Sequence, residues 1–116
     1  MQDLIPSDNP QQNKIERDGI KMSKVYLFVE INVKSGKIPE FLGPLQKHAA
    51  HMRTEDGLEV LDVFRDTQDA NKLCVWEVWR DRASWDAHME NDASKAWRPV
   101  AAQYVDSETI TIMDSI

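Results

Sequence analysis

The chain has 116 residues, of which 41% are hydrophobic and 29% are charged, and its formal net charge is −6. This length suits one domain with a thin core, and the acidic balance argues against a nucleic-acid partner. The longest apolar run, residues 25–29, is far shorter than the ~20 residues that a membrane helix requires, so no membrane partner is expected. No signal peptide is recognisable in the sequence. A single cysteine, Cys74, excludes an intrachain disulfide and suits a reducing compartment, so a cytoplasmic location is expected.

Residues 1–22 are polar and show no hydrophobic periodicity, so they are predicted to form an N-terminal arm before a domain over residues 23–116. A flexible arm and an arm that wraps a partner subunit are both compatible with this composition.

The rest of the chain alternates between strand and helix patterns. Side chains alternate with a period of two over residues 24–33, and apolar residues then recur at helical spacing until Asp56-Gly57. Later elements are expected as strands over 58–65, 73–80 and 109–113, with a short helix after Asp81 and a helical restart at Asp92 or Ser94. The order β-α-β-β-α-β predicts an α+β, ferredoxin-like subunit with an antiparallel sheet covered by helices on one face.

Both faces of the predicted sheet carry large apolar side chains, although helices cover only one of them. In the third strand, Val75 and Trp79 share one face, while Trp76 and Val78 share the other. A second copy of the sheet packed on the open face would bury this apolar surface, so a homodimer is expected.

Glu77 and His88 are the candidate catalytic residues. Glu77 shares a strand face with Val75 and Trp79, so helices over that face would bury its carboxyl and raise its pKa. An edge-exposed or salt-bridged glutamate is the alternative. His88 shares the apolar stripe of its short helix with Trp85, where a buried structural histidine is the alternative. We predict that His88 and Glu77 face each other, with Glu77 receiving the ring N–H and orienting the base.

Several common kinds of site are missing from the sequence. Four glycines leave no phosphate-binding loop, and neither a zinc-ligand spacing nor a nucleophile elbow occurs. His48 and His51 are three residues apart on the long helix, but no third ligand is in register, so no metal site is predicted.

Four tryptophans in 116 residues suit either core packing or a pocket lined by aromatic rings. An aromatic ligand would be favoured by a pocket walled by Phe41, Leu45, Trp79 and Trp85. A polar or phosphorylated ligand would be favoured if His48 or Arg65 pointed inward.

Three stretches resemble the antibiotic biosynthesis monooxygenase superfamily: residues 29–33, residues 55–58, and residues 75–79 with Ala87-His88 behind them. The resemblance covers residues 24–116 and implies a ferredoxin-like subunit, a homodimer whose sheets form a dimeric α/β barrel, and a pocket between sheet and helices. Members of the superfamily include monooxygenases that oxidise phenols, anthrones or quinols with O₂ and no cofactor. In these enzymes the substrate supplies the electrons after it loses a proton.

The resemblance also implies that Trp79 and Trp85 line the pocket. Val75 stands where one well-known member has asparagine, which weighs against polyketide-type oxidation. Haem-degrading relatives differ from this chain at positions 88 and 98, which weighs against haem.

The function predicted is that of a cofactor-independent monooxygenase that acts on a quinol or another electron-rich aromatic molecule. His88 and Glu77 would be catalytic, and the substrate would contact Phe41, Leu45, His48, Val75, Trp79 and Trp85. The alternatives are a non-oxidative isomerase, a protein that binds a small metabolite, and an interaction module without an active site.

Overall fold

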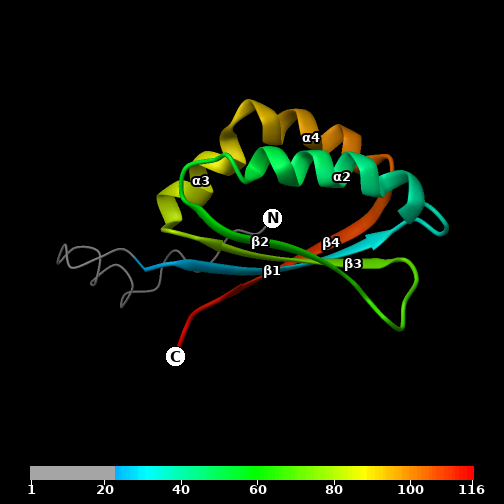
Figure 1. Cartoon of the computed structure of the whole chain (residues 1–116), viewed down its shortest axis with the longest axis horizontal. Coiled ribbons are helices and arrows are strands. Elements are labelled where there is room, and N and C mark those ends of the chain that lie inside the picture. Colours follow the sequence, from blue (N-terminus) through cyan, green and yellow to red (C-terminus); the bar gives the residue numbers. More distant parts are fainter. Residues whose placement is uncertain (1–22) are drawn as a thin grey trace.

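The computed structural model describes residues 23–116, in which the elements follow the order β-α-β-β-α-α-β (Figure 1). The strands are β1 (Val25–Val33), β2 (Leu58–Arg65), β3 (Lys72–Trp79) and β4 (Val105–Met113). The helices are α2 (Ile38–Met52), α3 (Arg82–Glu90) and α4 (Asp92–Ala102). The predicted α+β, ferredoxin-like class is confirmed, while the predicted arm of residues 1–22 lies outside the described residues.

The four strands form one sheet in the order β2-β3-β1-β4, and each neighbouring pair is antiparallel. The three helices cover one face of this sheet and leave the other face open (Figure 1). None of the helices within residues 23–116 is long and apolar enough to cross a membrane.

The second helical segment is divided into α3 and α4 by Asn91. Asn91 has an extended backbone with φ −77° and ψ 165°, and its side chain accepts a hydrogen bond from the backbone N–H of Ser94 at 2.8 Å. Asp81 caps α3 in the same way, through the backbone N–H of Ser84 at 2.8 Å. The expected helical restart at Asp92 is confirmed. A helix can begin there because the capping side chain of Asn91 satisfies a backbone N–H that the first turn leaves unpaired.

The core lies between the helix-covered sheet face and the apolar stripe of α2. Its largest fully buried side chains are Leu27, Phe41, Leu73 and Trp79. Strand β1 supplies its alternate residues to this core because it is central in the sheet and paired on both edges.

The open sheet face carries large apolar side chains, as the alternation in β3 predicts. The rings of Tyr26 and Trp76 stack there with centroids 6.1 Å apart, and the neighbouring Phe64 is 52% exposed. This face has no covering layer among the described residues, so it offers a surface on which a second subunit could pack.

Candidate active site

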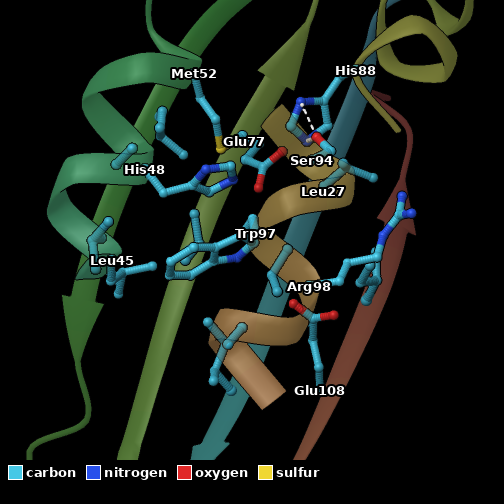
Figure 2. A pocket seen from close by; sticks show the side chains of 18 of the residues that line it. Leu27, Leu45, His48, Met52, Glu77, His88, Ser94, Trp97, Arg98 and Glu108 are labelled. Atoms are coloured by element: carbon cyan, nitrogen blue, oxygen red, sulfur yellow. Dashed lines mark hydrogen bonds between the residues drawn. The ribbon is translucent and has the colours of Figure 1, made fainter. Parts of the chain in front are cut away.

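A cavity of about 290 Å³ lies between the sheet and the helices α2 and α4 (Figure 2). Its walls are mostly apolar, and its volume is at the lower end of those of small-molecule sites. All of the predicted site residues except Trp79 line it: Phe41, Leu45, His48, Val75, Glu77, Trp85 and His88. Trp79 is instead fully buried behind the wall, and Arg65 does not line the cavity.

Glu77 is on the helix-covered face of β3, where it pairs across the sheet with Leu27 of β1 and Leu61 of β2. Its Oε1 accepts a hydrogen bond from Trp79 Nε1 at 2.9 Å, and no ion pair joins it to any described residue. Burial raises the pKa of Glu77 to about 7, against the lowering effect of the Trp79 hydrogen bond. Near neutral pH this carboxyl can therefore accept or donate a proton inside the cavity.

His88 is on the inner side of α3, but its hydrogen-bond partner differs from the predicted one. Nδ1 of His88 lies 2.8 Å from Oε1 of Glu55, and no hydrogen bond joins it to Glu77. The Glu77 carboxyl instead holds the indole N–H of Trp79, whose ring centroid lies 4.9 Å from that of His88. The predicted contact between His88 and Glu77 is therefore absent, and Glu55 is the carboxylate that contacts the His88 ring.

His48 points into the cavity from α2, stacked on Trp97 of α4 (Figure 2). The two rings are 4.4 Å apart and 6° from parallel. Burial, followed by the nearby His88, lowers the pKa of His48 to about 4. His48 is therefore neutral at pH 7. It points inward, as expected for a polar ligand, and gives the cavity a polar edge without a positive charge of its own.

Arg98 of α4 and Glu108 of β4 lie at one end of the cavity, beside the edge strand (Figure 2). Desolvation raises the pKa of the Glu108 carboxyl, although the residue is exposed to solvent at this end of the cavity, which is its mouth. Sequence patterns did not identify either residue, because α4 and β4 present few apolar side chains from which a buried face could be inferred. Among residues 23–116, no group of three or more His, Cys, Asp and Glu side chains is placed to hold a metal ion.

The arrangement joins an aromatic and aliphatic enclosure to groups that can move a proton. Phe41, Val75 and Trp85 supply apolar walls, and His88 and Glu77 supply titratable groups within the same enclosure. A flat organic molecule with an acidic O–H or C–H group matches both properties.

Comparison with known proteins places this fold among named relatives. A family model described as Antibiotic biosynthesis monooxygenase matches residues 24–100. "Putative monooxygenase YcnE" of Bacillus subtilis (strain 168) is 33% identical over 66 residues, which are 57% of this chain and 70% of that protein.

Solved structures agree in architecture. A conserved protein from Methanosarcina mazei Go1 superposes with a TM-score of 0.76 and 23% identity, over 82% of this chain and 95% of that one. A structure described as an antibiotic biosynthesis monooxygenase superposes with a TM-score of 0.74 and 22% identity, over 79% of this chain and 98% of that one. At these identities the structural likeness shows the fold alone.

Proposed function

Since the chain belongs to the antibiotic biosynthesis monooxygenase family, we propose that it oxidises a quinol or another electron-rich aromatic molecule with O₂ and without a cofactor. The observation that carries this proposal is the position of His88 and Glu77 in the wall of one largely apolar cavity. An apolar enclosure favours an aromatic guest, and a nearby base raises the reactivity of that guest by removing a proton.

In the proposed reaction, His88 takes the acidic proton of the bound substrate. The resulting anion is a stronger electron donor than the neutral molecule, so it can reduce O₂ directly. One oxygen atom then forms a bond to a substrate carbon, and the other leaves as water with the two hydrogens that the substrate loses. General-base help of this kind typically contributes ~10²–10⁴-fold to the rate.

Glu77 is proposed to anchor the substrate at the same end of the cavity. Its Oε1 is already occupied by the indole N–H of Trp79, which leaves its second oxygen for a substrate hydroxyl. With a pKa of about 7, this carboxyl can present a hydrogen-bond donor or an acceptor at neutral pH. The aromatic ring of the substrate would then pack between the sheet and the rings of Phe41 and Trp97.

The proposal includes a homodimer formed through the open sheet face. Tyr26, Phe64 and Trp76 place aromatic surface on this face, opposite the helices. A second copy would remove that surface from water, and the hydrophobic effect favours such burial. The cavity lies on the other side of the sheet and remains accessible from its mouth.

The test is O₂ uptake by the full-length, metal-stripped protein with a panel of benzene, naphthalene and anthracene hydroquinones. We expect uptake above the rate of uncatalysed autoxidation, reduced about 10²-fold or more in His88→Gln. His51→Gln is the matched control, because His51 is an exposed histidine on α2 and does not line the cavity. Absence of catalysed uptake across the panel would contradict the proposal, and ligand binding without uptake would favour the isomerase or binding-protein alternatives.

A further inference from the structure

Glu55 holds His88 from outside the cavity. The two side chains are nearly buried, at 12% and 11% exposed respectively, and the Glu55 Oε1 to His88 Nδ1 distance is 2.8 Å. His88 lines both the cavity and an outer cleft, whereas Glu55 lines only the outer cleft. Nδ1 is therefore engaged by a carboxylate that does not line the cavity.

The contact also determines which ring nitrogen carries the hydrogen. A neutral imidazole has one N–H donor and one acceptor nitrogen, and an ionised carboxylate can only accept. Nδ1 must therefore donate to Glu55, which leaves Nε2 as the acceptor. Ser94 Oγ lies 3.3 Å from Nδ1 and 3.5 Å from Nε2, so the shorter contact of Nδ1 is the one with Glu55.

We propose that Glu55 is the positioning residue of this site, which fixes His88 as the Nδ1–H tautomer and leaves Nε2 unprotonated, so that Nε2 can act as the base. Free histidine in water favours the opposite tautomer, with the hydrogen on Nε2, so the carboxylate has to impose this form. When Nε2 takes up a second proton, the adjacent negative charge stabilises the imidazolium. The tautomer itself follows from the geometry, and only its catalytic consequence rests on the proposed function.

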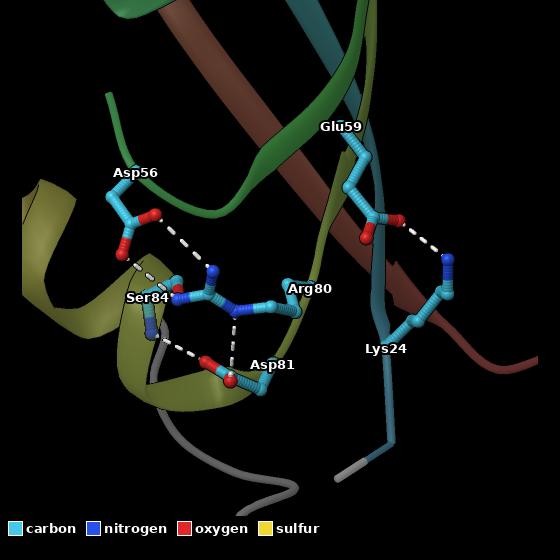
Figure 3. Close-up of polar contacts among 6 residues, drawn as sticks. All are labelled: Lys24, Asp56, Glu59, Arg80, Asp81 and Ser84. Carbon is cyan, nitrogen blue, oxygen red and sulfur yellow. Dashed lines mark hydrogen bonds and ion pairs between the residues drawn. The ribbon is translucent and has the colours of Figure 1, made fainter. Parts of the chain in front are cut away.

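Arg80 links Asp56, the residue after Glu55, to Ser84 of α3, the helix to which His88 belongs (Figure 3). Arg80 donates to both carboxylate oxygens of Asp56, at 3.2 and 3.0 Å, and its Nη2 also lies 3.0 Å from Ser84 Oγ in the first turn of α3. A bidentate pair of this kind fixes direction as well as distance. Arg80 therefore links the residue next to Glu55 to the first turn of α3, although the Asp56 side chain is 89% exposed and such a surface pair contributes little energy by itself.

Gly57 brings the same two segments close together. Its φ is +93°, and a Cβ at this position would lie 2.3 Å from Ser84 Oγ. Only glycine allows the loop to approach α3 this closely. The approach places the Glu55 carboxylate within hydrogen-bond distance of the His88 ring.

A role in stability alone explains this carboxylate poorly. Among the described residues, Glu55 Oε2 is buried and has no hydrogen-bond partner. A buried charge that is only half satisfied is weak evidence for stabilisation, because apolar replacements of such pairs are often neutral or favourable. A carboxylate that orients the base and stabilises its protonated form gives this buried group a role beside His88.

The tautomer is measured from long-range ¹H–¹⁵N correlation spectra of the histidine side chains in the ¹⁵N-labelled full-length protein at pH 8. The His88 signals are assigned by their loss in His88→Gln. We expect the Nδ1–H pattern for His88 in the wild type and a shift towards the Nε2–H pattern in Glu55→Gln, whose amide can also donate to Nδ1. Glu59→Gln, at an exposed position of β2, should leave the spectrum of His88 unchanged.

An Nε2–H pattern for His88 in the wild type would overturn the proposal without reference to any variant, and so would an unchanged pattern in folded Glu55→Gln. Where a hydroquinone is oxidised, Glu55→Gln should lower kcat by up to the ~10²–10⁴-fold that general-base help contributes, with little change in KM. Glu55→Asp should restore part of the loss. If the tautomer is as expected but no hydroquinone is oxidised, the proposed function fails while the positioning role of Glu55 stands.

Discussion

Replacement of Glu77 by glutamine should remove a pH-dependent cost to folding. Burial raises the pKa of this carboxyl from 4.5 to about 7, so between these values the folded protein keeps a proton that the unfolded chain releases. The stability contributed by this protonation is present in full below about pH 4.5 and is lost as the pH rises through about 7. At about 1.4 kcal/mol for each pKa unit, the ionised carboxylate costs the folded state about 3 kcal/mol at pH 8. Glu77→Gln cannot ionise, and its amide oxygen can still accept the indole hydrogen bond of Trp79.

Urea unfolding of the wild type and Glu77→Gln at pH 5 and pH 8 measures this cost. The difference in free energy of unfolding between the two proteins should shift by about 2–3 kcal/mol in favour of the variant between pH 5 and pH 8. Other titrating groups cancel in this comparison because both proteins contain them. Glu59→Gln, which loses only a surface ion pair with Lys24, should not show the shift. A difference that is the same at both pH values would refute the assignment of Glu77 as a desolvated carboxyl.

Two further predictions concern the loop and the open face. Gly57→Ala should lower the free energy of unfolding by about 2–4 kcal/mol, because it combines a positive φ with a clash against Ser84. Gly36→Ala, where φ is +74° but no atom lies near the added Cβ, should cost only about 1 kcal/mol. Thermal and urea unfolding of both variants checks this, and equal losses would contradict the close approach at Gly57. Phe64→Asp should weaken the proposed dimer at least about 10-fold in Kd, whereas Val100→Asp, at an exposed position of α4, should not. Sedimentation velocity across a concentration series distinguishes the two, and a wild type that is monomeric at every concentration would contradict the proposed interface.

Elements with regular spacing could be predicted from the sequence. The alternation along β3 and the helical stripe of α2 fix which side chains face inward, so the cavity positions of Phe41, Leu45 and Val75 could be predicted from periodicity. The start of β4 could not be predicted from the sequence, because Asp106, Ser107 and Glu108 give the first half of this strand the composition of a loop. Pairing with β1, which the local sequence does not reveal, makes these residues part of the sheet.

The hydrogen-bond partner of His88 could not be predicted from the sequence. Glu77 was the natural candidate because both residues lie on inward-facing stripes of regular elements. Glu55 belongs instead to the turn after α2, which lies close to α3 through the backbone of Gly57 and is linked to α3 by the contacts of Arg80 with Asp56 and Ser84. No periodicity describes a loop held by tertiary contacts. Residues 55–58 mark the end of the long helix and form part of the family resemblance, but neither pattern indicates that Glu55 contacts His88.

The central claim is that this cavity supports the transfer of one oxygen atom from O₂ to an aromatic substrate. Its most direct test is turnover under ¹⁸O₂ of the hydroquinone that gives the fastest uptake, followed by mass spectrometry of the rapidly quenched product. The account predicts one labelled oxygen atom in the product and the other in water. An unlabelled oxidised product formed together with H₂O₂ would show an oxidase, and an unlabelled isomer formed without O₂ uptake would show an isomerase; either result would contradict the claim.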